Sequence, residues 1–201
     1  MRICFFGDSF VNGTGDDDGL GWVGRVVARA RQGGCDMTAY NLGIRRDTSA
    51  DIAARWMEEA RRRLSPEHHG RLVFSFGAND CTAGDEAALA RLAPAQSLAN
   101  AAAVLTAARN WLPTLMIGPP VVADNHEANQ RIGALSAEYA RLCGDLGVPY
   151  LEMCRMTQAA SVWAQEARAG DGVHPNRGGY SLVADAVVNW TAWSVWTALS
   201  S

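Results

Sequence analysis

The 201-residue sequence contains no lysine, so all 18 of its basic residues are arginine. This absence excludes Schiff-base chemistry on lysine, serine–lysine dyads and the phosphate-binding lysine of Walker-type loops. Charge is also sparse, at 19% of residues with a net charge of −3. Such a weak net charge gives no reason to expect nucleic acid or an anionic membrane surface as a partner.

The cysteines show neither C-x-x-C spacing nor an even number. A disulfide framework or a zinc knuckle is therefore not expected, and a reducing compartment is the simplest interpretation. The first seven residues are typical of a core strand and have no signal-peptide apolar region or cleavage site. If Met1 is the true start, we expect a cytoplasmic protein. The cysteines are Cys4, Cys35, Cys81, Cys143 and Cys154.

Nucleotide-binding signatures and membrane-length apolar runs are missing as well. No G-x-G-x-x-G or Walker pattern follows an expected strand, so we expect no cofactor. Asp185 and Asn189 interrupt the apolar C-terminal segment, which argues against a spanning helix. Trp190, Trp193 and Trp196 in that segment favour packing against a sheet or a dimer seam, which leaves a homo-oligomer open. Without repeats or linkers, residues 1–201 are predicted to form a single domain.

Short apolar runs alternate with amphipathic helical patterns, which indicates βα units around a parallel sheet. Thr48 and Asp51 could cap one helix, and the last helix is expected to run from about Arg177 to about Leu199. The expected strands are Arg2–Gly7, Met37–Leu42, Leu72–Phe76, Thr114–Ile117 and Pro149–Glu152.

Ser9 follows the first expected strand, in Gly7-Asp8-Ser9-Phe10. A nucleophilic serine at the carboxyl end of a strand can project its hydroxyl into a cleft and turn its own N–H toward the oxyanion that it creates. A serine in this place can also be a simple helix cap.

Among the four histidines, His174 is the best candidate for the base that Ser9 needs. It lies in Asp171-Gly172-Val173-His174 between the last strand and the last helix, and Asp171 could orient the imidazole. Capping of that helix is the alternative. His68 and His69 precede the third strand, on the opposite edge, and His126 has no obvious partner apart from Asp124, so a surface loop is expected for it.

Two further strand ends offer donors for a developing negative charge. Asn79 follows the third strand in Gly77-Ala78-Asn79-Asp80, and Gly43 ends the second. A side-chain amide and a backbone N–H could stabilise an oxyanion there, although either residue could serve turn chemistry alone. Because the carboxyl ends of parallel strands share one edge, these residues are expected to meet Ser9 and His174.

Several neighbouring residues are open to two interpretations. Arg45 and Arg46 could recognise an anionic substrate or form a solvated pair, and Trp22 could line a pocket or belong to the core. Asp80, like Asp8, is expected to organise its loop as a hydrogen-bond acceptor, with substrate contact as a secondary possibility. The acidic run 16–18 is expected to be a solvated loop rather than a metal site.

In these motifs the sequence resembles the GDSL, or SGNH, hydrolase family. Gly7–Ser9 is similar to its first block, Gly43 to the second, Gly77–Asp80 to the third and Asp171–Pro175 to the fifth. Phe10 replaces the leucine of the family name, and Arg46 stands where many relatives carry glycine, which leaves the shape of the second loop uncertain.

The resemblance implies a flavodoxin-like α/β/α sandwich with a five-stranded parallel sheet in the order 2-1-3-4-5. It also implies an esterase without metal or cofactor: Ser9 as nucleophile, His174 as base, Asp171 as its orienting acid, and Ser9, Gly43 and Asn79 as the oxyanion hole. The expected substrate is a short-chain ester, such as an acetyl ester of a carbohydrate. An acyltransferase using the same residues and a non-catalytic binding module are the alternatives.

Overall fold

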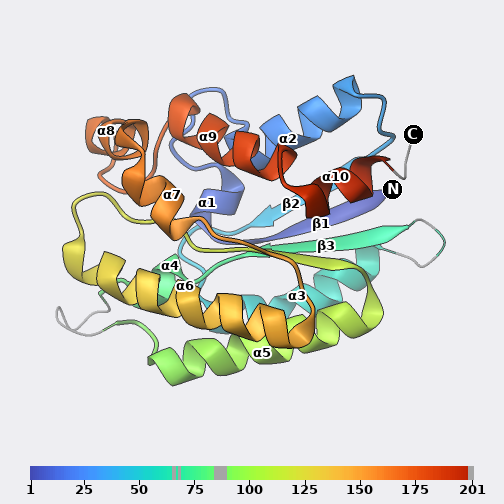
Figure 1. Cartoon of the computed structure of the whole chain (residues 1–201), viewed down its shortest axis with the longest axis horizontal. Coiled ribbons are helices and arrows are strands. Elements are labelled where there is room, and N and C mark those ends of the chain that lie inside the picture. The colour runs from blue at the N-terminus through green and yellow to red at the C-terminus, as the bar shows by residue number, and fades with distance from the viewer. Residues whose placement is uncertain (65–66, 68, 84–89, 199–201) are drawn as a thin grey trace.

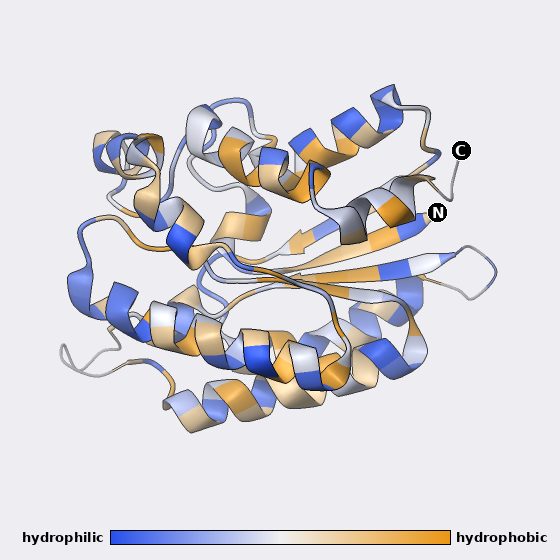
Figure 2. Ribbon diagram, viewed as in Figure 1, coloured by the Kyte–Doolittle hydropathy of each residue, from blue (hydrophilic) through white to orange (hydrophobic). Residues whose placement is uncertain are grey.

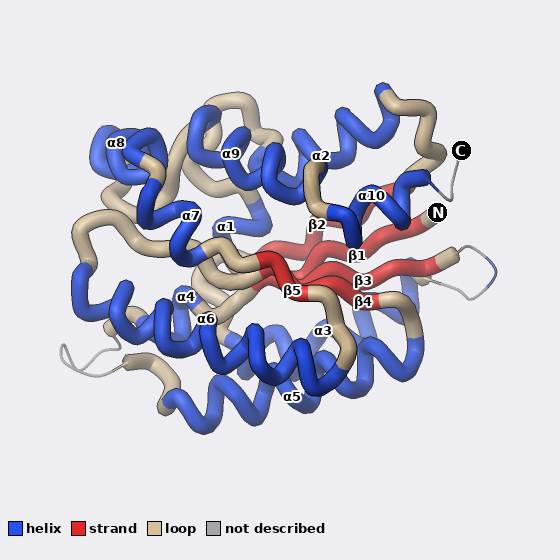
Figure 3. The backbone as a smooth tube through the Cα atoms, in the orientation of Figure 1, coloured by secondary structure: helices blue, strands red, loops and turns tan. Residues whose placement is uncertain are grey.

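The computed structural model describes residues 1–64, 67, 69–83 and 90–198. Its centre is a parallel sheet of five strands in the order β2-β1-β3-β4-β5, which confirms the predicted topology (Figure 3). Each expected strand is present, with bounds that differ by up to two residues. The strands are β1 (Arg2–Gly7), β2 (Thr38–Gly43), β3 (Gly70–Ser75), β4 (Thr114–Ile117) and β5 (Tyr150–Leu151).

The central strands are apolar on both sides because helices cover both faces of the sheet. Every residue from Ile3 to Gly7 is buried in β1, and all four residues of β4 are buried as well. Figure 2 shows these apolar strands between helices whose outer faces are polar. Continuous rather than alternating apolar runs are the expected signature of such a covered sheet.

Helices form the outer layers of an α/β/α sandwich (Figure 1). On one face lie α2 (Gly21–Gln32), α9 (Arg177–Val188) and α10 (Thr191–Ala198). The other face carries α3 (Ser49–Arg63), α5 (Pro94–Trp111) and α6 (His126–Leu146). The shorter helices lie toward the carboxyl end of the sheet: α1 (Ser9–Asn12), α4 (Ala78–Cys81), α7 (Cys154–Ala159) and α8 (Ser161–Ala169).

Helix α3 begins where the sequence predicts. The Thr48 hydroxyl accepts a hydrogen bond from the Asp51 N–H, and the Asp51 carboxylate accepts one from the Thr48 N–H, which completes a capping box. Ile52, Trp56 and Ala60 form its buried stripe.

The expected single C-terminal helix is wrong, because the chain breaks after Val188 into α9 and α10. Asn189 ends α9, and its side-chain amide donates to the Asp185 carbonyl at 2.9 Å. The break turns Trp193 onto the sheet, where its ring lies 6.2 Å from that of Phe5 in β1. Trp193 and Trp196 are buried, so they pack against the sheet as expected. Leu199 lies outside the described residues.

In the described part of the chain, no helix combines the length and the hydropathy that crossing a bilayer requires. The strands β1, β2 and β3 end in register, with Gly7 opposite both Gly43 and Ser75. The loops that leave these three strands therefore start from one edge, which is where parallel sheets bind ligands.

Candidate active site

Ser9 begins helix α1 directly after β1. Asp8 is the N-cap of this helix, and its carboxyl accepts the Phe10 N–H at 2.9 Å. The turn is tight, because a Cβ on Gly7 would lie 2.1 Å from the Ser75 carbonyl oxygen. Two features therefore hold Ser9 at the carboxyl edge of the sheet: the preceding Gly7, where no other residue fits, and the capped start of α1.

The structure brings Ser9, His174 and Asp171 into one hydrogen-bonded chain. The distance from His174 Nε2 to Ser9 Oγ is 2.7 Å, and that from His174 Nδ1 to Asp171 Oδ2 is 2.7 Å. Asp171 Oδ1 also accepts the backbone N–H groups of Val173 and His174, at 3.0 and 2.9 Å. The aspartate thus fixes both the ring and the turn that carries it, as a base-orienting residue must.

The protonation states suit a general base. Burial lowers the pKa of His174 below its usual value; the Asp171 carboxylate opposes this effect, and Arg45 adds to it. Burial by itself would raise the pKa of Asp171, but hydrogen bonds from the backbone and ring of His174 and from the Val173 N–H outweigh it and lower the pKa to about 2. A neutral imidazole therefore faces Ser9 while a carboxylate faces its other nitrogen.

Asn79 lies on α4, after β3, and its side-chain Nδ2 donates to the Asp47 carbonyl at 2.9 Å. An amide nitrogen carries two hydrogens, so a second donor remains. The Ser9 N–H has no acceptor among the described residues. These groups are available as donors to an oxyanion.

Gly43 is not free to play the donor role expected of it. Its N–H already donates to Asn41 Oδ1 at 3.1 Å. A Cβ at this position would lie 2.3 Å from the Asn12 nitrogen and 2.7 Å from the Asp8 carbonyl oxygen. Gly43 therefore serves the close approach of β2 to α1, which requires a residue without a side chain.

Two N–H groups of the second loop, those of Arg45 and Arg46, have no acceptor among the described residues. The Asp47 N–H donates to the Ile44 carbonyl at 3.2 Å, closing a turn in which Arg46 has a φ of 74°. The next residue, Asp47, supplies the carbonyl that accepts the hydrogen bond from Asn79. Arg46 stands where many relatives carry glycine, the residue that most readily adopts a positive φ. That comparison was the sequence signal for this turn.

Arg45 and Arg46 occupy different environments. The Arg45 guanidinium is 60% exposed and lies 3.3 Å from Asp171 Oδ2. The Arg46 carbonyl accepts from Arg91 at 2.7 Å. Arg45 borders a cavity of about 640 Å³ beside the histidine, lined in part by Thr14, Asp17, Glu166, His174 and Arg177.

Trp22 and Asp80 are both buried. Trp22 is 2% exposed and packs edge-to-face on Phe5 at 5.8 Å, so it belongs to the core. Asp80 is 1% exposed, and its Oδ1 accepts the Ser49 N–H at 2.8 Å. It organises the loop by tying the end of β3 to the start of α3, and the secondary expectation of substrate contact is wrong.

Burial raises the pKa of Asp8 and Asp80, the carboxyl groups that adjoin Ser9 and Asn79 in sequence. Burial is the main cause of the rise in the pKa of Asp8, to about 7. The hydrogen bond from the Phe10 N–H opposes this rise, and the nearby carboxylates of Asp80 and Asp47 add to it. Burial also raises the pKa of Asp80. The hydrogen-bond partners of these carboxyl groups are the Phe10 and Ser49 N–H groups and not Ser9 Oγ, so we assign them no proton-transfer role.

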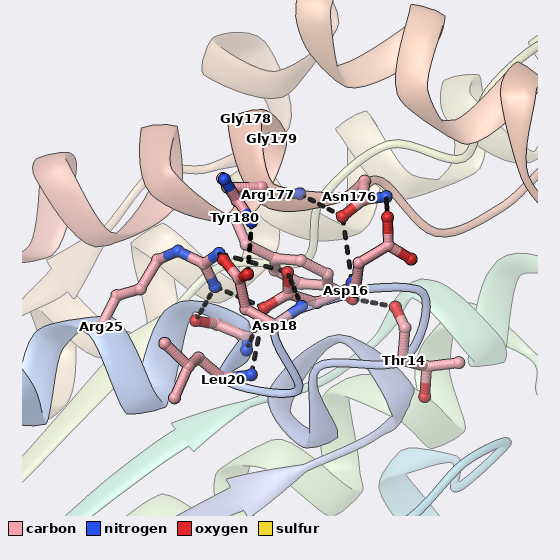
Figure 4. Close-up of polar contacts among 12 residues, drawn as sticks. Thr14, Asp16, Asp18, Leu20, Arg25, Asn176, Arg177, Gly178, Gly179 and Tyr180 are labelled. Atoms are coloured by element: carbon pink, nitrogen blue, oxygen red, sulfur yellow. Dashed lines mark hydrogen bonds and ion pairs between the residues drawn. The ribbon is translucent and has the colours of Figure 1, made fainter.

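The acidic run 16–18 is not uniformly solvated. Asp16 is buried and accepts hydrogen bonds from the Arg25 guanidinium and from the N–H groups of Leu20 and Gly21. Asp18 pairs with Arg25 at 2.8 Å (Figure 4). These carboxylates have protein partners, and no cluster of metal-binding side chains occurs in the part of the chain that the structure describes.

The remaining histidines lie away from the site. His126 is exposed at the start of α6, where its ring contacts Gln130 at 3.0 Å. His69 precedes β3, at the opposite edge of the sheet, and His68 lies outside the described residues. His174 is therefore the described histidine within reach of Ser9.

Solved structures show the same fold at low sequence identity. An acetylxylan esterase from Geobacillus stearothermophilus superposes with a TM-score of 0.77 at 16% identity, covering 95% of each chain. A lipase/acylhydrolase from Enterococcus faecalis gives 0.76 at 21% identity over 93% of each chain. LAE5, an alpha/beta hydrolase from a Lake Arreo metagenome, gives 0.75 at 20% identity over 96% of this chain and 94% of its own.

No curated protein matches the sequence significantly. The family model for the GDSL-like lipase/acylhydrolase family, in contrast, matches residues 5–182 and so spans every element that carries the site, from β1 to α9. The resemblance in the short motifs thus extends over most of the sequence. The chain belongs to the GDSL-like lipase/acylhydrolase family, whose members hydrolyse carboxylic esters.

Proposed function

We propose that the protein hydrolyses short-chain carboxylic esters, acetyl esters of carbohydrates in particular, through an acyl-enzyme on Ser9. The observation that carries this proposal is the continuous hydrogen-bond chain from Ser9 through His174 to Asp171. Variants of the Geobacillus acetylxylan esterase described as catalytic mutants replace a serine, an aspartate and a histidine, the last two three positions apart, as Asp171 and His174 are.

In this mechanism His174 Nε2 takes the hydroxyl proton as Ser9 Oγ attacks the acyl carbon. Asp171 stabilises the imidazolium that forms. His174 then protonates the leaving alkoxide, and the acyl group remains on Ser9. A water molecule, activated by the same imidazole, hydrolyses the acyl-enzyme and restores the serine.

We assign the oxyanion of each tetrahedral intermediate to the N–H groups of Ser9 and Arg46 and to Nδ2 of Asn79. The support for this set is that the two backbone N–H groups have no acceptor in the described structure, whereas the Gly43 N–H is already bonded to Asn41. Asn79 is anchored on Asp47, next to Arg46 in the chain. Preorganised donors of this kind lower the reaction barrier because they stabilise negative charge that develops only in the transition state.

The lining of the cavity supports a hydroxyl-bearing leaving group rather than a lipid. Charged or amide side chains contribute to its lining, among them Asp17, Arg45, Asn176 and Arg177. Such groups can donate to and accept from sugar hydroxyls, whereas a long acyl chain needs an apolar surface. The named activity of the Geobacillus neighbour, on acetyl-xylooligosaccharides, agrees with this chemistry.

An ester panel tests the substrate proposal. With p-nitrophenyl acetate, butyrate, octanoate and laurate, kcat/KM should be highest for acetate or butyrate and about 10-fold or more lower for octanoate, because the polar lining beside His174 gives a longer acyl chain no burial that would offset the cost of ordering it. Acetylated xylooligosaccharides should release acetate. A maximum at octanoate or laurate would contradict the short-chain assignment.

The pH dependence of the reaction follows from the lowered pKa of His174. The free imidazole is the active form, so kcat/KM should fall as pH decreases through the pKa of His174, with half-maximal activity below pH 6.5. Replacing Arg45 with glutamine should move this acid limb to higher pH, because the guanidinium disfavours the imidazolium. A pH profile of kcat/KM measures both, and an acid limb centred above pH 7 in the wild type would contradict the assignment.

A further inference from the structure

The N-terminus of α9, which follows His174, is capped from another helix. Asn176 is its N-cap, but the Asn176 side-chain oxygen accepts the N–H groups of Arg177 and Asp17. The next two N–H groups of the helix, on Gly178 and Gly179, donate instead to Glu166 in α8, at 2.9 and 2.7 Å. The Asn176 N–H donates to the same carboxylate at 2.9 Å.

Glu166 thereby closes a ring around the base and its aspartate. The chain runs from Glu166 through Asp171 and His174 to Asn176, and the Glu166 side chain bonds back to the far end of this segment. At the near end the Gly170 N–H donates to the Glu166 carbonyl, and the Gly172 N–H donates to the Ala167 carbonyl at 2.8 Å. The turn that presents His174 is thus fixed at both ends by the last turns of α8.

The glycines of α9 make this approach possible. A Cβ on Gly178 would lie 2.6 Å from Glu166 Oε1, and one on Gly179 would lie 2.4 Å from the Pro175 Cβ. Glycine is otherwise unfavourable in a helix, by about 1 kcal/mol relative to alanine. Here it admits a carboxylate to the helix N-terminus, where negative charge is favourable.

The loop that follows the nucleophile's helix holds the same helix end from the other side. Asn176 Nδ2 donates to Asp17 at 2.6 Å, and the Tyr180 hydroxyl donates to the Thr14 carbonyl at 2.6 Å (Figure 4). A Cβ on Gly15 would lie 2.9 Å from the His174 Cβ, so this loop packs directly on the base. Segments from both sides of the catalytic pair therefore converge on the start of α9.

We propose that Glu166 is a positioning residue that sets His174 at hydrogen-bonding distance from Ser9 by clamping the first turn of α9. The proposal rests on the function proposed above. Glu166 lines the cavity, but backbone N–H groups occupy both of its carboxylate oxygens, so it acts through the backbone of the His174 turn and not on the substrate. A displacement of about 1 Å between reacting groups can cost on the order of 100-fold in rate.

The first test compares Glu166→Ala and Glu166→Gln. Glu166→Ala should lower kcat for p-nitrophenyl acetate by about 10- to 100-fold while KM stays within about 3-fold, because the base is misplaced and the acyl site is untouched. Glu166→Gln should recover part of kcat, since its one carbonyl oxygen can still accept two of the N–H groups. Unchanged kcat in Glu166→Ala would overturn the proposal.

Val187→Ala is the matched control for a loss of helix stability. Val187 is 1% exposed on the same helix, more than two turns from the clamp, so its truncation destabilises α9 without touching Glu166. All variants are assayed at least 20 °C below their melting temperatures. Val187→Ala should keep kcat within about 2-fold of wild type; an equal loss of kcat in Val187→Ala and Glu166→Ala at similar melting temperatures would contradict a positioning role.

Gly178→Ala perturbs the clamp from the other partner. Its Cβ displaces the Glu166 carboxylate, so kcat should fall even though alanine is the better helix former. In the Glu166→Ala background the same change should cost kcat much less, and additive losses would overturn the proposal.

Ser9→Ala in the same assay separates the two proposals. If Ser9→Ala retains the wild-type rate, the mechanism on Ser9 fails. If Ser9→Ala is inactive and Glu166→Ala has a normal kcat, only the clamp is overturned.

Discussion

Replacing Ser9 with alanine should lower kcat for ester hydrolysis by about 10⁴- to 10⁶-fold and leave the fold intact. In the proposed mechanism the hydroxyl is the attacking group, so its loss should remove the acyl-enzyme route altogether. His174→Ala should cost a similar factor, and the double variant little more, because the two side chains act as one unit across a 2.7 Å hydrogen bond. Initial rates with p-nitrophenyl acetate, after correction for spontaneous hydrolysis, measure the effect.

The matched control for this loss is Ser194→Ala. Ser194 is an exposed serine on α10, so the variant that replaces it should keep full activity. Circular dichroism and thermal melting should show Ser9→Ala to be folded. A folded Ser9→Ala variant with more than about a tenth of the wild-type rate would place the reaction on another group.

Replacing Asn79 with alanine should lower kcat by about 10²- to 10³-fold with little change in KM, because in the proposed mechanism its side-chain amide donates a hydrogen bond to the oxyanion in the transition state and not to the resting ester. Arg46→Gly is the informative partner variant. It removes the guanidinium, keeps the backbone N–H and suits the φ of 74°, so kcat should stay within about 3-fold of wild type.

Steady-state kinetics of the two variants side by side decide which group acts at the second loop. A loss in Arg46→Gly as large as that in Asn79→Ala would show that the Arg46 side chain, rather than its N–H, stabilises the intermediate. A nearly normal kcat in Asn79→Ala would remove Asn79 from the oxyanion site. The anchoring bond from Asn79 to the Asp47 carbonyl is lost in the same variant, so thermal melting should accompany the kinetics.

The sheet order was implied by the resemblance to a known family, whereas the meeting of Ser9 with His174 and Asp171 could be predicted from the residues themselves. Strand ends in a parallel sheet lie on one edge, and an Asp-x-x-His turn points both side chains the same way, so positions far apart in sequence could be brought together without tertiary detail. The same rule placed His68 and His69, which precede a strand, on the opposite edge, whereas His126 follows a strand and was set aside because it had no obvious partner apart from Asp124.

What the sequence could not settle depends on contacts between loops. Gly43 and Arg46 differ as donors only because Asn41 occupies one N–H and the turn at Ile44 leaves the other free. Asp16 is buried because Arg25, a turn into α2, pairs with it, and an acidic run by itself indicates only solvent. The role inferred for Glu166 was invisible because its partners are backbone N–H groups, which leave no side-chain signature.

Covalent labelling followed by peptide mapping tests the central claim most directly. A fluorophosphonate probe reacts with a serine only when a neighbouring base activates it. We predict one adduct in the wild type, on the peptide that contains Ser9, and labelling slowed by about 10³-fold or more in His174→Ala. No adduct, an adduct on another residue, or equal labelling rates in the wild type and His174→Ala would contradict a catalytic pair of Ser9 and His174 at this edge of the sheet.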